Sequence, residues 1–217
     1  MFETIVITCP FFFDEEAEAI NNYLHRGFKV HIRKPESNIR QVEGLLCRIP
    51  VEYRSRVVLH DFFSLAEQYA VGGVHLNSRN AEPPKGWGGT VSRSCHSLEE
   101  VRQWKNEMNY VSLSPIYDSI SKKGYMSAFS KEALAKAVSD GTIDEKVYAL
   151  GGVTFDKLQE VYQTGFGGAM ILGDAWKGLK DSFSRLAAFG LRYAPEHPRS
   201  GRKASQAPSG RIEGLKN

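Results

Sequence analysis

Residues 91–124 decide the fold of this chain, and they read VSRSCHSLEEVRQWKNEMNYVSLSPIYDSISKKG. A short β-rich run opens the segment, and a second one follows an amphipathic stretch that begins at Ser97. Ser97 and Glu100 have the spacing of a capping box, which predicts a helix start at this point. Each strand is followed by a polar loop, and the first loop holds Ser94 and His96. The segment therefore predicts strand, loop, helix, strand and loop, the repeating unit of an α/β fold with a parallel sheet.

The same alternation runs along most of the chain. Several β-rich runs are apolar throughout, as expected for strands of a parallel sheet that is covered on both faces. The predicted strands are Thr4–Thr8, Lys29–Arg33, Val57–Leu59, Gly73–Leu76, Thr90–Ser92, Tyr110–Ser114, Val147–Leu150 and Ala169–Leu172. The predicted helices include Glu15–Arg26, Leu65–Ala70, Leu98–Glu107, Lys131–Ser139, Phe155–Thr164 and Leu179–Leu191. Eight strands with intervening helices predict a compact (β/α)8 TIM barrel.

A doubly wound open sheet is the alternative architecture, but no Gly-rich dinucleotide turn follows Thr8. The connection 77–89 is rich in Pro and Gly, which predicts little helix there. In a barrel the loops that follow the strands all lie on one face, and that face carries the active site. Polar side chains of loops far apart in sequence can therefore converge, among them His96, Ser94, Ser119, Ser121 and Lys122.

The composition is that of a globular protein with an ordinary core. The chain has 217 residues, of which 41% are hydrophobic and 24% charged, enough for one domain with a tail. Its apolar runs are too short to span a bilayer, and its N-terminus lacks the basic region of a signal peptide. The cysteines Cys9, Cys47 and Cys95 are odd in number and scattered, which favours a cytoplasmic location over a disulfide framework.

The excess positive charge lies in the C-terminal tail. The formal net charge is +3, and the segment from Pro195 holds five basic residues against two acidic ones. Residues 1–194 are therefore balanced in charge, which gives no electrostatic support for nucleic-acid binding by a barrel domain of that extent. Residues 195–217 are rich in Pro, Ser and Gly and poor in hydrophobic residues, so we predict a disordered basic tail.

Glycines end the last two predicted strands. The strand before Gly151 and Gly152 and the strand before Gly173 are the seventh and eighth in order. Loops at these places commonly bind phosphate in barrels, because backbone N–H groups without an intervening side chain can approach the anion. The alternative is that the glycines only make tight turns. We predict a phosphate site here, with Leu172 beside Gly173.

Several side chains near predicted strand ends are candidates for chemistry. An imidazole near pH 7 can both donate and accept a proton, so His96 is a candidate general acid–base, or else an exposed or structural histidine. Asp61 is a candidate Mg²⁺ ligand, or else the cap of a helix near Phe62. Arg33 and Lys34 end the second strand, where they bind an acidic group or form a surface ion pair. The aromatic run Phe11–Phe13 lines the barrel mouth or, as we expect, is buried beneath the first helix.

Taken in order, five segments resemble the superfamily of thiamin phosphate synthases and thiazole tautomerases. The segments are HIRKPE, HDFFSLAEQYAVGGVHLNSRN, SCHSLEEV, SPIYDSISKKG and LGGVTFDKL with GFGGAMILGDAW. The resemblance implies a barrel that binds the phosphate of a thiazole phosphate at Gly151, Gly152, Leu172 and Gly173. In the synthases a pyrimidine pyrophosphate binds beside it with Mg²⁺, pyrophosphate departs, and the thiazole nitrogen attacks the pyrimidine cation. The positions similar to those that handle pyrophosphate and metal are Arg33, Asp61, Ser94, Ser119, Ser121 and Lys122.

The sequence departs from the synthase pattern at four positions. The Gln of the second strand is His31, and its Lys is Pro35, with Lys34 adjacent but on the opposite strand face. The Asn before Asp61 is His60, and the second metal-binding aspartate is Asn80. One carboxylate without the strand-two lysine is expected to hold Mg²⁺ and pyrophosphate less well.

These departures favour the tautomerase branch, which needs neither metal nor pyrophosphate. We therefore predict a thiazole tautomerase in which His96, with Ser94, moves the proton that makes the thiazole phosphate carboxylate aromatic. Substrate-binding candidates are Gly151, Gly152, Leu172, Gly173, Arg33, Lys34, Ser119, Ser121, Lys122, His31, His60 and Asn80. The alternatives are a Mg²⁺-dependent synthase, with Asp61 as metal ligand, and a non-catalytic phosphate-binding or regulatory barrel. Homo-oligomers are an alternative to a monomer by resemblance alone.

Overall fold

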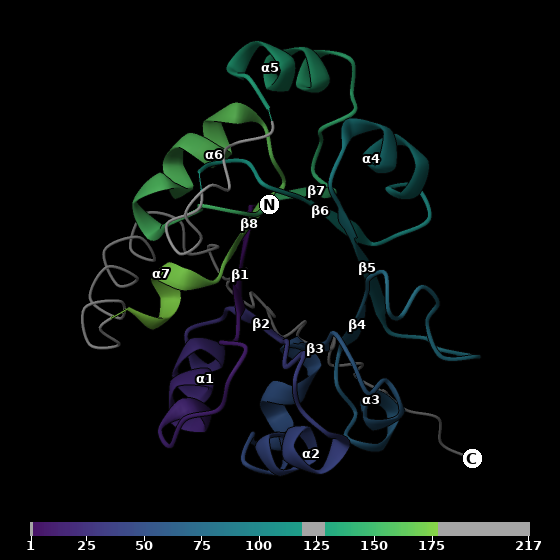
Figure 1. Cartoon of the computed structure of the whole chain (residues 1–217), viewed down its shortest axis with the longest axis vertical. Coiled ribbons are helices and arrows are strands. Elements are labelled where there is room, and N and C mark those ends of the chain that lie inside the picture. The colour runs from purple at the N-terminus through teal and green to yellow at the C-terminus, as the bar shows by residue number, and fades with distance from the viewer. Residues whose placement is uncertain (1, 119–128, 178–217) are drawn as a thin grey trace, which may run out of the picture.

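The computed structural model describes residues 2–118 and 129–177, and they form a closed parallel barrel (Figure 1). The strands pair in sequence order, β1 to β8, and β8 pairs with β1 to close the ring. Their bounds are β1 Glu3–Ile7, β2 Lys29–Ile32, β3 Val57–Leu59, β4 Gly73–Leu76, β5 Thr90–Cys95, β6 Tyr110–Leu113, β7 Val147–Ala149 and β8 Gly168–Ile171. The predicted (β/α)8 barrel is confirmed.

Helices surround the strands on the outside of the barrel (Figure 1). The α-helices are α1 Glu16–His25, α2 Ile39–Cys47, α3 Ser64–Gln68, α4 Leu98–Trp104, α5 Lys131–Ser139, α6 Leu158–Thr164 and α7 Gly173–Trp176. Two 3₁₀ helices, η1 Val51–Arg56 and η2 Phe155–Lys157, precede β3 and α6. No helix in the described ranges has the length and apolar character needed to cross a membrane.

Most predicted elements differ from the observed ones by only a few residues at their ends. The largest strand difference is β5, which continues to Cys95 because Ser94 and Cys95 pair with β6. The helix α2 was not predicted, although Asn38 and Gln41 open it with a reciprocal capping box. Residues 77–89 hold no helix, as predicted. The predicted helix 179–191 and the predicted tail 195–217 lie outside the described residues.

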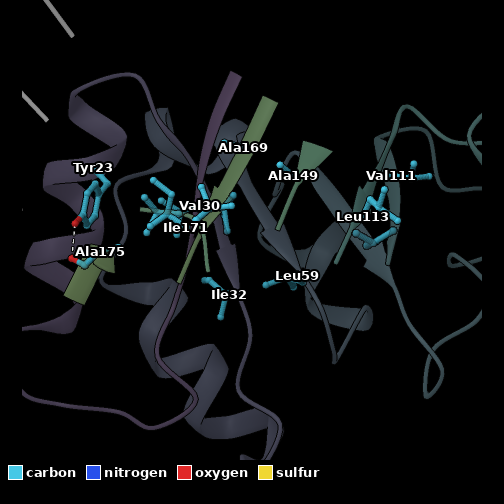
Figure 2. Close-up of a cluster of buried hydrophobic side chains, with 14 of the residues drawn as sticks. Tyr23, Val30, Ile32, Leu59, Val111, Leu113, Ala149, Ala169, Ile171 and Ala175 are labelled. Carbon is cyan, nitrogen blue, oxygen red and sulfur yellow. Dashed lines mark hydrogen bonds between the residues drawn. The ribbon is translucent and has the colours of Figure 1, made fainter. Parts of the chain in front are cut away.

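The core lies between the outer face of the strands and the helices (Figure 2). Alternate strand residues such as Val30, Ile32 and Leu59 are buried there. The other residues of each strand point into the barrel, where one half is apolar and is filled by a separate cluster of Ile5, Ile7, Tyr110, Tyr148 and Met170. The strands β2 and β4 and the residue that follows β3 instead bring the polar side chains of His31, His75 and His60 to the interior.

The aromatic run Phe11–Phe13 is not buried beneath the first helix, contrary to our expectation. Phe11 is 63% exposed and Phe12 is 37% exposed. Phe13 packs edge-on against Trp176, with ring centroids 5.8 Å apart. The segment between β1 and α1 therefore lies at the surface, with Phe13 against α7.

Candidate active site at the mouth of the barrel

A cavity of about 630 Å³ lies at the carboxyl ends of the strands. This volume is within the range of roughly 300–1,000 Å³ that small-molecule sites have. Residues from both sides of the ring line it, including Arg33, His60, Arg79, Arg93, Ser94, His96, Ser114, Gly151, Gly152, Leu172 and Gly173. The fold thus brings together most of the described site residues that the sequence predicted, and it does so at the face where barrels carry their active sites.

One side of the cavity is made of backbone. Gly151 and Gly152 follow β7 with φ values of +87° and +64°, a conformation that favours glycine. A Cβ on Gly152 would lie 2.4 Å from the carbonyl oxygen of Asp118, so the turn excludes any side chain. Gly173 begins α7 after β8, and a Cβ on it would meet no atom within 4 Å. The backbone at Gly173 is therefore open, and phosphate binding there stays a prediction.

Two further residues support this glycine side, and neither was predicted. The carboxylate of Asp174 is buried and accepts a hydrogen bond from the backbone N–H of Phe155 at 3.0 Å, which ties the loop after β7 to α7. The ammonium of Lys157 donates to the carbonyl of Gly152 at 3.4 Å and lies 3.9 Å from the centroid of the Tyr117 ring. Lys157 therefore brings a positive charge to the loop at which we expect the phosphate.

His96 is held at the rim by three contacts. Its Nδ1 lies 3.2 Å from Oγ of Ser114 and 3.3 Å from the carbonyl oxygen of the same residue. Its backbone N–H donates to the carboxylate of Glu100 at 2.6 Å. Ser97 caps α4 as predicted, but Glu100 bonds to His96 and not to the N–H of Ser97, so only half of the predicted capping box forms. Glu100 thereby fixes the backbone of the candidate acid–base residue.

Ser94 lies on the strand β5 rather than in a loop, and its side chain faces the interior. Its Oγ lies 2.8 Å from Nε2 of His75, and Oγ of Ser92 lies 2.8 Å from Nδ1 of the same ring. Ser94 also lines the cavity beside His96. The structure thus places the two predicted catalytic residues on one wall, with Ser94 engaged by a buried histidine that the sequence analysis did not select.

The other side of the cavity carries three arginines, Arg33, Arg79 and Arg93. Burial, with the neighbouring charge of Arg79, lowers the pKa of Arg33. Arg79 contacts both carboxylate oxygens of Asp61 at 3.2 Å. The amide of Asn80 donates to Oδ1 of the same carboxylate at 2.8 Å. The Asp61 carboxylate therefore contacts the guanidinium of Arg79 and the amide of Asn80.

The residues present do not fit a protein-held Mg²⁺. Hard cations require free oxygen ligands, and the Asp61 carboxylate is paired with Arg79. Asp61 is not among the residues that line the cavity; within the described residues, the carboxylates that line it are those of Glu100 and Asp174, and each accepts a backbone N–H. The alternative that Asp61 caps a helix near Phe62 is wrong, because α3 begins after Phe63 without any side-chain cap.

Three histidines form a buried cluster beneath the cavity. Nδ1 of His31 lies 2.9 Å from Nε2 of His60, and Nε2 of His31 lies 2.6 Å from the hydroxyl of Tyr110. The rings of His60 and His75 stack with centroids 4.2 Å apart. Burial, with nearby charged groups, lowers the pKa of His31 and His60 well below the usual range and that of His75 to about 3. All three rings are therefore neutral at pH 7.

Lys34 does not reach the cavity. Its ammonium is buried on the outside of the barrel, where it pairs with the carboxylate of Glu16. It also donates to the carbonyls of Cys9 at 2.9 Å and Phe11 at 2.7 Å. Strand alternation is the reason, because Arg33 before it points toward the mouth and Lys34 must point the other way. The predicted substrate contact and the surface ion pair are both replaced by a buried ion pair.

Three predicted site residues, Ser119, Ser121 and Lys122, lie outside the described residues. The residues that the sequence analysis missed are His75, Arg79, Arg93, Glu100, Lys157 and Asp174. A signal for His75 was present, because period-two alternation along Gly73–Leu76 places its ring on the same inner face as His31. The arginines carried no such signal, since their direction depends on contacts across the rim.

Comparison with known proteins agrees with this architecture. The family model described as thiamine monophosphate synthase matches residues 5–173. The thiamine-phosphate synthase of Photorhabdus laumondii is 25% identical over 146 residues, which are 64% of this chain and 66% of that protein. The thiamine-phosphate synthase of Flavobacterium johnsoniae is 23% identical over 167 residues, which are 70% of this chain and 74% of that protein.

A solved structure is more similar still. The thiamine phosphate pyrophosphorylase from Bacteroides thetaiotaomicron superposes with a TM-score of 0.79 at 38% identity, covering 90% of this chain and 100% of that one. The family match extends from β1 to the first residue of α7, and so includes both sides of the cavity. The chain belongs to the thiamine monophosphate synthase family, a family of thiamin biosynthesis.

Proposed function

We propose that this chain is a thiamine phosphate synthase, which joins a pyrimidine pyrophosphate to a thiazole phosphate and releases pyrophosphate. The observation that carries the proposal is the layout of the cavity, which has anion-binding groups on two sides. Glycine backbone lies at the ends of β7 and β8, and arginines lie across the ring near β2, β4 and β5. Two substrates that both carry phosphate need two anion-binding sides. The names of the relatives support the same activity and, on that ground, we prefer it to the tautomerase.

In this proposal the glycine side binds the thiazole phosphate. The backbone at Gly173 is open to an anion, and Lys157 adds a cation near Gly152. Since the turn at Gly151 and Gly152 is closed to side chains, the phosphate is oriented by backbone and does not depend on a flexible side chain. The thiazole ring then extends toward the centre of the cavity.

The arginine side binds the pyrophosphate of the second substrate. The bond between the pyrimidine methylene carbon and the pyrophosphate oxygen breaks, and its electron pair leaves with pyrophosphate. The thiazole nitrogen then forms the new C–N bond, so no proton is consumed or released at that nitrogen. Arg33 and Arg79 stabilise the negative charge that develops on the leaving group, whereas Arg93 lies over the Trp104 ring and donates to the carbonyl of Ala81. We derive no step through Mg²⁺, because the carboxylates present are already paired.

The test is thiamin phosphate formation by the purified full chain with both substrates, once with Mg²⁺ and once with a chelator. Arg79→Gln should lower kcat/KM for the pyrimidine pyrophosphate roughly 10- to 100-fold, because a charge-assisted contact contributes about 1.5–3 kcal/mol. Arg102→Gln is the matched control, since Arg102 is 49% exposed against 51% for Arg79 and pairs with Asp140 away from the cavity. Absence of product under both conditions, while thiazole phosphate still binds, would overturn the proposal.

A thiazole tautomerase is the second candidate, and a specific observation favours it. Arg79 is already paired with Asp61, and Lys34 points away, which reduces the free positive charge on the arginine side. That side then suits a single carboxylate. His96, held through Nδ1 by Ser114, would move the proton with its other ring nitrogen.

The tautomerase is tested by following aromatisation of the thiazole phosphate carboxylate. His96→Asn should reduce turnover about 10²- to 10⁴-fold, the usual contribution of a general acid–base, and leave binding of thiazole phosphate intact. His25→Asn, an exposed histidine that contacts Tyr53, is the control. Equal turnover by His96→Asn and the unchanged chain would remove this candidate. Binding without turnover in either assay would support a non-catalytic barrel.

A further inference from the structure

The buried histidines beneath the cavity have the arrangement of a metal-ligand set. One ring nitrogen from each of His31, His60 and His75 lies within 4.8 Å of the others. Their exposed fractions are 0%, 5% and 0%. The three residues come from β2, the end of β3 and β4, so adjacent strands hold them from one side of the ring. The proposed activity uses none of them to bind phosphate.

Two of these histidines are departures from the pattern that the chain resembles. Where that pattern has Gln the chain has His31, and where it has Asn the chain has His60. Both changes converge in space, because the two rings lie 2.9 Å apart through Nδ1 and Nε2. Together with His75 they make a set of three neighbouring imidazoles.

We propose that His31, His60 and His75 bind one divalent transition-metal ion of the zinc class. Imidazole is a preferred ligand of zinc, cobalt, nickel and copper. In tetrahedral geometry with bonds of ~2.0–2.1 Å, ligand nitrogens lie about 3.3 Å apart. The present separations run from 2.9 Å to at most 4.8 Å, so side-chain adjustments of about an ångström produce the coordination distances.

For His31 the opposite ring nitrogen already has a partner that orients a metal ligand. Nε2 of His31 lies 2.6 Å from the hydroxyl of Tyr110, and Nδ1 faces His60. In His75 the two ring nitrogens contact Ser92 and Ser94, each at 2.8 Å, so the ion replaces one serine contact and the other orients the ring. Hydrogen bonds of this kind fix the tautomer and the orientation of a ligating ring.

The site also has an entry path and a free direction. His60 and Ser94 line the cavity, so an ion can arrive from the mouth of the barrel. Three protein ligands leave a fourth tetrahedral position open. That pattern is typical of a zinc ion that binds water or a substrate atom and not of a closed structural site. No proton need leave the protein, because each neutral ring can carry its hydrogen on the nitrogen that faces away from the ion.

The test is metal binding by the full, untagged chain after chelator treatment. Zn²⁺ titration should show one equivalent bound, and Co²⁺ should give visible absorption bands without the intense band of a cobalt–thiolate bond. His31→Gln and His60→Asn, which restore the residues of the resembled pattern, should each weaken the affinity about tenfold or more, because losing even an outer-shell partner costs about 10–100-fold. His25→Gln and Cys47→Ser, which change an exposed histidine and an exposed cysteine, should leave stoichiometry and affinity unchanged.

The outcomes separate the metal site from a purely structural histidine cluster. Less than half an equivalent of Zn²⁺ on the unchanged chain would overturn the proposal without any variant. Unchanged binding in both His31→Gln and His60→Asn would overturn it as well, as would a cobalt–thiolate band that disappears in Cys47→Ser. Circular dichroism of each variant shows whether it is folded. Because the readouts are binding and spectra, failure of the proposed synthase activity does not affect the result.

Discussion

The two sides of the barrel mouth differ in the groups that form them. The side at β7 and β8 is backbone, with Gly151 and Gly152 in left-handed conformations and Gly173 open to the cavity. The side at β2 to β4 is made of side chains whose tips contact one another, such as Arg79 with Asp61. A site made of backbone depends on which positions carry glycine. A site made of side chains depends on which polar groups contact one another, and these contacts can change while the fold stays the same.

The largest effect on stability is expected at Lys34, whose side chain points to the outside of the barrel and not into the cavity. Lys34→Met should lower the free energy of unfolding by about 3–5 kcal/mol, because the buried carboxylate of Glu16 loses its partner. Burial already disfavours the charged forms, raising the pKa of Glu16 and lowering that of Lys34. Urea denaturation measures the change.

The matched control for that variant is the double change Lys34→Met with Glu16→Leu. It removes both charges and should recover most of the lost stability, since apolar replacements of buried ion pairs are often neutral. A loss below about 1 kcal/mol for Lys34→Met alone would mean that Lys34 is not buried in solution and remains free for the mouth.

The next largest effect is the pH dependence of stability that comes from the three buried histidines on the β2–β4 side. The folded-state pKa of each buried histidine is lowered, mainly by burial and further by groups that include Lys29, Arg33 and Arg93. Below the unfolded value of about 6.5 the unfolded chain binds protons that the folded chain does not, so stability falls as pH falls. Between pH 7 and pH 5.5 the metal-free protein should lose roughly 3–4 kcal/mol from the three rings together.

Thermal or urea unfolding across that pH range, with a chelator present, measures this loss. The loss should continue at lower pH until the folded-state values are reached, which for His75 is about 3. The double variant His31→Gln with His60→Asn should show about a third of the slope, because one ring remains. A stability that is flat from pH 7 to pH 5.5 would show that the rings take up protons in the folded state as they do in the unfolded chain, and so are not shielded from water.

On the glycine side we expect a smaller effect on stability but a clear one on binding. Gly152→Ala should destabilise the protein by about 2 kcal/mol or more, from the left-handed backbone at about 1–2 kcal/mol and from the clash with Asp118. Gly173→Ala has free space and should change stability by less than about 0.5 kcal/mol. Its methyl group should nevertheless weaken binding of thiazole phosphate, which calorimetric titration measures.

The pair of glycine variants sharpens the comparison directly. If Gly173→Ala binds thiazole phosphate as tightly as the unchanged chain, the phosphate does not lie on this backbone. The arginine side would then have to hold both anions.

A small effect on stability is also expected at the ion pair between Arg79 and Asp61. Arg79→Gln should change the free energy of unfolding by no more than about 1 kcal/mol, as is usual for a surface pair. It should also free the carboxylate of Asp61, so the variant should bind Mg²⁺ more tightly than the unchanged chain does. Arg102→Gln should show no such gain. A Mg²⁺ affinity that Arg79→Gln leaves unchanged would indicate that Arg79 does not block the carboxylate in solution.

The fold could be predicted because its signals are local. β3 and β4 were predicted to the residue, since buried parallel strands are short apolar runs bounded by turn residues. β5 was predicted too short because Arg93 to Cys95 are polar or small, and only the pairing with β6 extends the strand. The helix α2 was missed although its capping residues, Asn38 and Gln41, were visible in the sequence.

The candidate site was predictable in part. Glycines at the ends of two strands indicated the backbone side, because a residue without a side chain lets a ligand approach the backbone closely in any fold. The direction of Lys34 also followed from alternation. Its partner Glu16 did not, because that contact joins α1 to the end of β2 across the outer surface. The engagement of Asp61 by Arg79 was equally hidden, since it depends on how two neighbouring loops fold over the rim.

Because β1 pairs with β8, the barrel can close only after β8 has been synthesised. Beside that pairing, the hydroxyl of Tyr23 donates to the carbonyl of Ala175 at 2.6 Å, and the indole of Trp176 donates to the carbonyl of Ile7 at 2.7 Å. Ile7 therefore leaves the ribosome long before its partner exists, by roughly ten to thirty seconds at about 5–20 residues per second. Throughout that interval one edge of β1 is an unpaired strand edge, which other chains can pair with. A nascent chain arrested before Trp176 should consequently depend on chaperones, whereas one arrested well beyond it should not.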